Sequence, residues 1–309
     1  MRGNPMYIAI EWTSAAFRAL LMDDDKVLEE RRSDRGTVSV PDRAFEAILR
    51  EELGDWAGKA ERILLSGMIT SRNGWIESPF VPTPAGPSDL PENAVRHNIA
   101  GLPPLLFLPG IAQTQPLPDV MRGEEMSLFG LAEADGLFVL PGPHAKWVRM
   151  KDGRITGITT YMSGEILNLL KRDSLVSRLI PLAYEEQPQA FRRGVLTAYN
   201  EGALPGRILA RIFSARSLVL FGLLKASEIS DYLSGLMIGA EIFEALHAQE
   251  EQRIYITGHS PLAHRYATAL GLFGKQGRVL MPDLAAGFRK VAASRSDSST
   301  SSVTKRIAD

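Results

Sequence analysis

The sequence predicts an α/β protein with two domains, each a mixed β-sheet with flanking helices. A hairpin pattern near residue 10 recurs near residue 150, which indicates two related halves. The chain has 309 residues, 45% of them hydrophobic, which is enough for two cores of ordinary size. Short apolar runs also recur singly between helical or loop segments, as buried strands of such sheets do. These runs are residues 63–65, 105–108, 137–140, 254–256 and 279–281.

The N-terminal half opens with a predicted hairpin. Residues 7–12 and 17–22 are apolar and β-prone, and small residues separate them. A turn at 23–25 and the run 26–30 predict a third antiparallel strand. From 42 to 56 the apolar residues have helical spacing, so the predicted order is three strands and then a helix.

The rest of the chain contains a second predicted hairpin, with strands at 146–150 and 154–160 and a turn at Asp152 and Gly153. Residues 79–104 are rich in Pro, Gly and Asn, which indicates an ordered surface loop, either bordering a ligand cleft or plainly connecting. We expect an N-terminal domain at 1–130 and a C-terminal domain at 131–293. Serine and threonine dominate 294–309, which we expect to be disordered.

The composition excludes several classes of partner and site. The 35 basic and 36 acidic residues give a net charge of -1, which leaves no excess positive field for a nucleic-acid backbone. The chain has no cysteine, so disulfides, cysteine-based zinc sites and thiol nucleophiles are absent, as suits a reducing cytoplasm. It shows neither a signal-peptide pattern nor an apolar run of membrane length. We expect a cytoplasmic protein without nucleic-acid or membrane partners, and a homo-oligomer is left open.

Two turns have the composition of phosphate-binding turns, although G-x-x-x-x-G-K-[ST] and G-x-G-x-x-G loops are absent. In residues 8–18, a strand ending near Glu11 enters a turn of small residues, whose N–H groups could meet a phosphate while Glu11 faces a hydrated metal. In residues 140–148, His144 and Lys146 lie beside a turn and would suit a nucleotide phosphate. An ordinary hairpin and a solvated turn are the alternatives.

Two further segments carry polar groups that could serve a binding or catalytic site. Residues 67–75 offer a fork for a carboxylate, hydrogen-bonding groups for hydroxyls and an aromatic wall, unless they form a solvated turn. These groups are Arg72, Ser71, Asn73 and Trp75. Glu124 and Glu125 follow Gly123 at a predicted helix start, where the macrodipole favours carboxylates. Alternatively, one of them is a general base that removes a proton from a hydroxyl.

In this order the segments resemble the 2-dehydro-3-deoxygalactonokinase family. The motifs typical of that family are G-M-x-G-S-R-x-G-W, D-V-M-R-G-E-E-T, P-G-T-H-S-K-W-V and M-[TS]-G-E, and their counterparts are residues 67–75, 119–126, 141–148 and 162–165. Later matches are F-S-A-R, Y-L-S-G-L-M-I-G and T-G-H-S-P-L-A at 213–216, 232–239 and 257–263. The resemblance implies a two-domain actin-like, hexokinase-like ATPase fold with an interdomain cleft.

The resemblance also implies an activity and its residues. ATP with Mg²⁺ would phosphorylate the terminal hydroxyl of 2-dehydro-3-deoxy-D-galactonate in galactonate catabolism. Glu124 is the implied base, Glu125 the secondary candidate, Glu11 the residue facing the metal, and Arg122 joins the substrate segment. The implied nucleotide-binding residues are Thr13, Ser14, Arg18, Gly142, His144, Lys146 and Gly258.

The sequence departs from the family pattern in both phosphate turns, which we expect to face each other across the cleft. Glu11 replaces an Asp and Thr13 a Gly, while Pro143 and Ala145 replace a Thr and a Ser, which removes two hydroxyls and one backbone donor. Two alternatives therefore stay open: a catalytically impaired homologue that acts as a sugar-acid-binding or regulatory protein, and a kinase for a different sugar acid.

Overall fold

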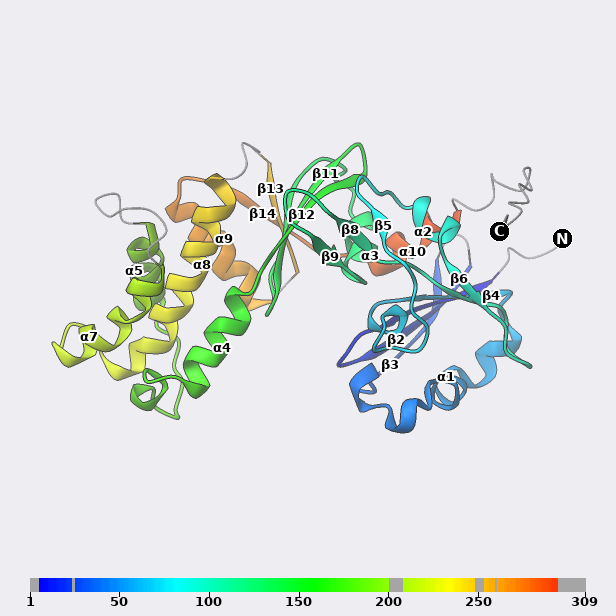
Figure 1. Cartoon of the computed structure of the whole chain (residues 1–309), viewed down its shortest axis with the longest axis horizontal. Helices are drawn as coiled ribbons and strands as arrows, with labels where there is room; N and C mark the ends of the chain where they lie inside the picture. The colour runs from blue at the N-terminus through cyan, green and yellow to red at the C-terminus, as the bar shows by residue number, and fades with distance from the viewer. Residues whose placement is uncertain (1–5, 24–25, 200–207, 248–252, 259, 294–309) are drawn as a thin grey trace, which may run out of the picture. The chain divides into compact units, whose positions relative to one another are not determined.

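The structure, a computed structural model, describes residues 6–23, 26–199, 208–247, 253–258 and 260–293 (Figure 1). The chain divides into two compact units. Unit 1 comprises residues 1–134, 152–157 and 282–309, and unit 2 comprises 135–151 and 158–281. The expected disorder of 294–309 falls outside the described residues, as does most of the turn at 23–25.

Unit 1 contains a six-stranded mixed sheet in the order β3-β2-β1-β4-β7-β6. β1 is antiparallel to β2 and parallel to β4, and β4 is parallel to β7. The hairpin and the third strand predicted at the start of the chain are therefore confirmed. The strands are β1 (Tyr7–Trp12), β2 (Phe17–Met22), β3 (Val27–Ser33), β4 (Arg62–Ser66), β6 (Val95–His97) and β7 (Leu105–Phe107).

The core of unit 1 lies between this sheet and α1 (Phe45–Leu53), the helix predicted within 42–56. Phe45, Leu49 and Leu53 recur every four residues and are buried, so one stripe of α1 faces the strands. The Trp12 ring meets Phe45 edge-on with centroids 5.7 Å apart. Each such buried side chain contributes roughly 1.5–3 kcal/mol of transfer free energy.

The predicted loop at 79–104 is more structured than expected. It contains β5 (Val81–Pro82), α2 (Asp89–Glu92) and β6, and β6 joins the main sheet beside β7. These elements have two to four residues each, too few for a period of apolar residues to appear. β5 also pairs with β8 (Ile111–Gln113), which pairs in turn with β9 (Asp119–Met121).

Helix α10 (Leu284–Ala293) belongs to unit 1, whereas the sequence placed it in a C-terminal domain of 131–293. It packs against α3 (Glu124–Phe129) at two glycines. A Cβ on Gly287 would lie 1.8 Å from the Met126 carbonyl oxygen, and one on Gly130 would lie 1.8 Å from that of Asp283. The apolar face of α10 marks it as a packed helix but does not specify which sheet it covers.

Unit 2 is built on a five-stranded mixed sheet in the order β12-β11-β10-β13-β14. β10 is antiparallel to β11 and parallel to β13. The hairpin predicted near 150 is confirmed, with positive φ angles at Asp152 and Gly153. The strands are β10 (Gly136–Leu140), β11 (Ala145–Lys151), β12 (Arg154–Tyr161), β13 (Ile254–Thr257) and β14 (Gly277–Leu280).

The helices of unit 2 centre on α8 (Ile229–His247), which is buried over most of its length. α5 (Pro188–Tyr199) crosses it closely, because a Cβ on Gly235 would lie 2.0 Å from the Phe191 carbonyl oxygen. The other helices are α4 (Ser163–Asp173), α6 (Ile208–Ile212), α7 (Ser214–Leu220) and α9 (Pro261–Leu272). Both units thus have the mixed sheet with helices that the sequence predicted.

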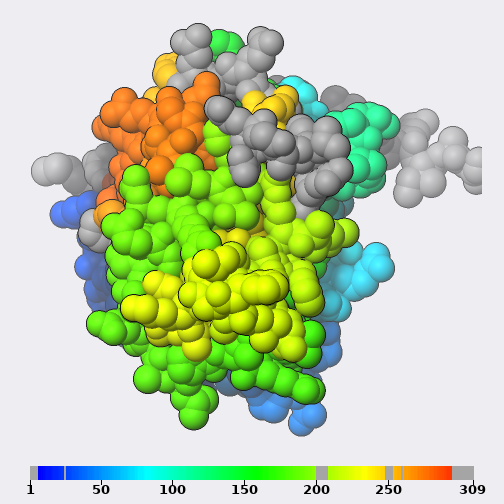
Figure 2. Space-filling model, turned by 90° about the vertical axis from the view of Figure 1, so that its left-hand side faces the viewer, coloured from blue at the N-terminus to red at the C-terminus, as the bar shows by residue number. Residues whose placement is uncertain are grey.

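The outer helical surface of unit 2 carries exposed apolar side chains. Figure 2 faces this surface, with the yellow-green and yellow segment around α7 outermost. Its exposed apolar residues include Leu209, Phe213, Leu220, Phe221 and Leu223. This surface leaves the expected homo-oligomer open. Among the helices that the structure describes, none is both long and apolar enough to cross a membrane.

The contact between α3 and α10 gives a first prediction. Gly287→Ala forces a methyl group into a backbone carbonyl, so we expect the free energy of unfolding to fall by roughly 1–3 kcal/mol. Gly271→Ala in α9 is the matched control, because its Cβ would meet nothing within 4 Å. It should change stability by less than about 1 kcal/mol. Urea unfolding of the two variants measures both values, and equal losses would contradict the assigned contact.

Candidate active site

Three carboxylates of unit 1 gather where β1 and β4 end. Glu11 lies near the end of β1, in register with Ser66, the last residue of β4. Glu124 and Glu125 are the first two residues of α3. Burial, followed by the nearby charge of Glu124, raises the pKa of both Glu11 and Glu125, although Arg18 acts against this at Glu11. The three carboxyl groups therefore form one electrostatic cluster.

Two glycines allow the start of α3 to reach the end of β4. Gly123 has a φ of 110° and Gly67 a φ of 93°, which side-chain-bearing residues rarely adopt. A Cβ on Gly123 would lie 3.0 Å from the Cα atom of Gly67. The backbone conformation at these positions thus places Glu124 and Glu125 beside the β4 strand end.

The carboxylate of Glu125 accepts hydrogen bonds from the backbone. Its side chain is fully buried, and the Gly123 N–H donates to its two oxygens at 2.8 and 2.7 Å. The Ser66 hydroxyl lies 3.4 Å from Oε1. Burial raises the pKa of Glu125 to about 7. These contacts favour a role in holding the helix start over direct proton transfer.

Glu124 is the more accessible of the two glutamates. It is half-buried, and its Oε2 accepts a hydrogen bond from the Arg122 backbone N–H at 2.9 Å. This contact satisfies a backbone donor just before the helix, which is the structural role expected of a carboxylate there. The position also leaves Glu124 close enough to Glu11 for its charge to affect the pKa of Glu11.

Arg18 is engaged within the sheet. It lies opposite Glu11 in the β1–β2 pair, and its Nε donates to Glu30 of β3 at 2.8 Å. Its charge lowers the pKa of Glu11, but burial of the Glu11 carboxyl is the larger effect and the pKa is raised. The structure thus gives the predicted phosphate-binding arginine a carboxylate partner.

The N–H groups of the first predicted phosphate turn form hydrogen bonds within the turn itself. The Thr13 hydroxyl accepts hydrogen bonds from the N–H groups of Ala15 at 3.3 Å and Ala16 at 3.0 Å. The Thr13 N–H donates to the Ala16 carbonyl at 2.9 Å, and Ser14 is exposed. Two donors expected to face a phosphate are therefore occupied, because a threonine hydroxyl competes for nearby backbone groups.

Arg122 braces the loop expected to bind the sugar acid. One terminal nitrogen donates to the carbonyl and hydroxyl oxygens of Thr70 at 2.5 and 2.8 Å, and the other to the Ser78 carbonyl at 3.0 Å. The guanidinium carbon lies 4.2 Å from the ring centroid of Phe80. The Ser71 hydroxyl is also used locally, donating to the Met68 carbonyl at 2.7 Å.

The remaining predicted substrate residues divide into exposed and packed side chains. Asn73 is exposed, and the Arg72 side chain is 84% exposed with its Nε 3.4 Å from Glu77. Trp75, expected to form an aromatic wall, is partly buried and packs on the core beside Phe45 and Phe107, and its role toward substrate stays a prediction. Sequence spacing identified the loop but not the direction in which its aromatic residue turns.

The second predicted phosphate turn lies in unit 2, between β10 and β11. The start of α4 covers it: the Glu165 N–H donates to the Pro143 carbonyl at 2.9 Å, and a Cβ on Gly164 would lie 2.4 Å from the Gly142 oxygen. His144 contacts the Glu165 carboxylate through Nε2. Because the two turns belong to different units, the expectation that they face each other stays a prediction.

Other predicted nucleotide residues adjoin the same sheet edge. Gly258 follows β13 with a φ of 106°, and its N–H donates to the Leu280 carbonyl at 3.0 Å. Since β10 and β13 are parallel neighbours, their carboxyl ends bring Gly258 and the turn at 141–144 to one edge. Lys146 is buried on β11, where its Nζ donates to the Thr160 hydroxyl at 3.0 Å.

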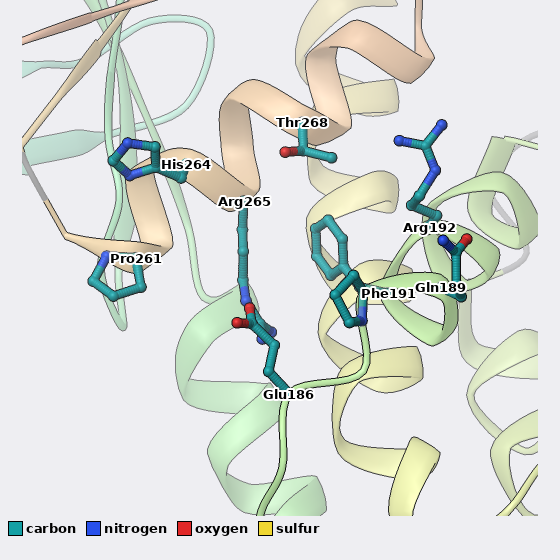
Figure 3. A pocket seen from close by; sticks show the side chains of 9 residues that line it. Glu186, Gln189, Phe191, Arg192, Pro261, His264, Arg265 and Thr268 are labelled. Carbon is teal, nitrogen blue, oxygen red and sulfur yellow. The ribbon is translucent and has the colours of Figure 1, made fainter.

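A pocket of about 570 Å³ opens beside the start of α9 (Figure 3). Phe191 forms an apolar wall, and the Arg265 guanidinium lies 5.3 Å from its ring centroid. Arg265 is held by Asp231 at 2.6 Å and by Glu186 at 3.2 Å. The lining residues are Glu186, Pro188, Gln189, Phe191, Arg192, Pro261, His264, Arg265 and Thr268.

Sequence reasoning missed this pocket. Its one available signal was the spacing of Pro261, His264, Arg265 and Thr268, which places them on one helix face that begins within the T-G-H-S-P-L-A motif. Among the described residues, no group of three or more His, Cys, Asp or Glu side chains is arranged to hold a metal ion.

Comparison with known proteins identifies close relatives. The family model described as 2-keto-3-deoxy-galactonokinase matches residues 11–290. The 2-dehydro-3-deoxygalactonokinase of Escherichia coli (strain K12) is 32% identical over 294 residues, which cover 93% of this chain and 97% of that protein. A crystal structure described as that of a putative 2-dehydro-3-deoxygalactonokinase protein from Sinorhizobium meliloti is 31% identical, with a TM-score of 0.83 over 95% of this chain and 99% of the other.

The buried Glu125 gives a prediction about pH. An ordinary glutamate has a pKa of 4.5, and burial raises that of Glu125 to about 7, so the folded state binds the extra proton between these values. The stability that this group contributes is complete below about pH 4.5 and is lost as pH rises to about 7, by up to roughly 3 kcal/mol.

Glu125→Gln cannot ionise and should lack this loss. Urea unfolding at several pH values between 4.5 and 8 should therefore show the variant gaining stability relative to the wild type as pH rises. Curves that stay parallel across the range would mean that Glu125 titrates like a solvated carboxyl group.

Proposed function

The chain belongs to the 2-keto-3-deoxy-galactonokinase family, and on this premise we propose that it phosphorylates the terminal hydroxyl of 2-dehydro-3-deoxy-D-galactonate with ATP, in galactonate catabolism. The observation that carries the proposal is the family match over residues 11–290, which includes the carboxylate cluster of unit 1 and the turn at 141–144 of unit 2. The protein is an ATP-dependent sugar-acid kinase.

Glu124 is the proposed general base. Its carboxylate is half-buried at the strand ends, whereas Glu125 is fully buried and bonded to the backbone. In the reaction, the terminal hydroxyl of the sugar acid gives its proton to Glu124, its oxygen bonds to the γ-phosphorus, and ADP leaves with the electrons of the broken bond. Glu125 keeps the helix start, and thus Glu124, in place.

Glu11 is proposed to face a hydrated Mg²⁺ that accompanies ATP. Burial is the main cause of the raised pKa of Glu11, and the negative charge of Glu124 adds to it, so a divalent cation would favour the ionised form of Glu11. Mg²⁺ keeps several waters and commonly takes one or two carboxylates together with phosphate oxygens. A small carboxylate set therefore fits this ion, which supplies positive charge to the phosphates when bound.

Unit 2 is proposed to bind the nucleotide. The turn at 141–144, His144 and Lys146 would contact phosphates, and Gly258 lies at the same strand edge. The pocket begins at Pro261, three residues beyond Gly258, so a nucleotide whose phosphates lie at the strand ends can place its base there. Phe191 offers an apolar wall, and Gln189 and Thr268 offer hydrogen bonds.

The loop at 68–80 is proposed to bind the sugar acid. Arg72 is exposed and paired only at 3.4 Å, so its planar fork can turn to a carboxylate. Ser71 and Asn73 adjoin it and can meet hydroxyls. Arg122 and Trp75 would hold the loop from behind through the contacts described above.

A second candidate function is a sugar-acid-binding regulatory protein without phosphoryl transfer. The occupied N–H groups of Ala15 and Ala16 favour it, because they reduce the donors available to a phosphate in the first turn. Loss of one donor to the developing charge costs on the order of 3 kcal/mol of transition-state stabilisation. The assay below distinguishes the two functions.

The purified protein should produce ADP in a coupled assay with Mg-ATP and 2-dehydro-3-deoxy-D-galactonate, and more slowly with analogues that lack the carboxylate. Glu124→Gln keeps the shape of the side chain but cannot take the proton, so kcat should fall by roughly 100-fold or more while KM changes little. A variant with normal turnover would reassign the base to Glu125 or Glu11. A wild type inactive on every sugar acid tested would support the regulatory protein.

The pocket gives a separate prediction. Thr268 is exposed on α9 and lines the pocket, so the bulk of the side chain in Thr268→Trp can fill it. We expect KM for ATP to rise by roughly 10-fold or more, with KM for the sugar acid unchanged. Leu196→Trp adds similar bulk at an exposed position of α5 outside the lining and serves as the control. An unchanged KM for ATP in Thr268→Trp would mean that the nucleotide base of ATP does not bind in this pocket.

A further inference from the structure

A buried carboxylate in unit 2 connects three elements around the turn at 141–144. Glu241 of α8 is 3% exposed. It accepts hydrogen bonds from Trp147 Nε1 of β11 at 2.7 Å, from the Tyr266 hydroxyl of α9 at 2.9 Å, and from the Ser163 hydroxyl at the start of α4. We call these four side chains the Glu241 network.

Each donor of the Glu241 network adjoins a segment proposed to bind ATP. Trp147 directly follows Lys146 on β11. Ser163 precedes Gly164 and Glu165, which cover the turn at 141–144 through the Pro143 carbonyl and His144.

The third donor reaches the pocket side. Tyr266 lies on α9, between Arg265 and Thr268 of the pocket lining, and α9 begins three residues after Gly258. The Glu241 network therefore ties the phosphate turn to the pocket through a single carboxylate.

A gain in folding stability does not by itself explain why a carboxylate is buried at this position. Burial raises the pKa of Glu241, although the bonds from Ser163, Trp147 and Tyr266 act in the opposite direction. Replacing a buried charge and its partners by packed apolar residues is often neutral or stabilising, whereas removing one partner of such a group is costly. A carboxylate that accepts three hydrogen bonds instead fixes the relative positions of the elements that carry the three donors.

We propose that Glu241 is a positioning residue for ATP: through Ser163, Trp147 and Tyr266 it fixes the turn at 141–144 relative to α9. This inference rests on the proposed function. Without the carboxylate, the start of α4 loses its tie to α8 and can move away from the turn that it covers. Displacements of about 1 Å in a positioning group can cost roughly 100-fold in rate.

The test uses one mild variant, one strong variant and a control. Ser163→Ala removes a single donor, and Glu241→Gln removes the charge. Tyr232→Phe is the control, because Tyr232 is also a fully buried residue of α8, and its hydroxyl bonds at 2.6 Å to Ser214 of α7, outside the proposed nucleotide segments. For each we would measure KM for ATP, KM for the sugar acid, Kd for ADP by calorimetry, and the melting temperature.

Ser163→Ala and Glu241→Gln should raise KM for ATP and Kd for ADP by roughly 10-fold or more, with KM for the sugar acid changing less than about twofold. Tyr232→Phe should lower the melting temperature without changing either nucleotide constant. If Glu241→Gln does not fold, Ser163→Ala carries the test by itself.

Nucleotide constants in Ser163→Ala that match those of Tyr232→Phe, in a wild type that binds ADP, would overturn this inference and leave the kinase proposal intact. A parallel rise in both KM values would also overturn it, because it would indicate a general loss of structure. A wild type that binds neither ADP nor ATP would instead overturn the proposed function, and the inference with it.

Discussion

The candidate site of unit 1 depends on the contact between the buried carboxylate of Glu125 and the N–H of Gly123. That contact fixes the first residues of α3, and the Ser66 hydroxyl, 3.4 Å from Glu125 Oε1, links them to the end of β4, where Gly67 leaves little room for a side chain on Gly123. Glu124 then projects beside Glu11, and the Arg122 guanidinium reaches the loop at 68–80. A short helix of six residues is thereby able to present a carboxylate in a defined position.

Unit 2 uses a related arrangement on a larger scale. Glu241, like Glu125, is withdrawn from solvent and accepts hydrogen bonds, in its case from side chains of three other elements. In both units a buried glutamate, Glu125 or Glu241, accepts hydrogen bonds that hold neighbouring groups in place. The groups that remain accessible, such as Glu124, Arg72 and His144, are the ones proposed to meet substrates.

Features set by local pattern could be predicted from the sequence, and features set by long-range packing could not. Apolar, β-prone runs and the residues of the turns between them predicted both hairpins, and motif order identified the loops that carry Arg72 and His144. The closure of the Thr13 turn, the inward packing of Trp75 and the assignment of α10 to unit 1 each depend on what a segment meets after folding. The pocket beside α9 combines two helices that are about 70 residues apart, so the spacing of residues on α9 could indicate only one of its walls.

The docking of α10 on α3 also has a consequence for how the protein is made. Because unit 1 includes residues 282–309, a nascent chain that has completed unit 2 still lacks the helix that covers α3. On the ribosome, unit 2 has all of its sequence available first, and the apolar face of α3 stays uncovered until α10 emerges. About 150 residues separate α3 from α10, so synthesis at 5–20 residues per second makes α10 many seconds after α3. During that interval the apolar face of α3 is available to chaperones.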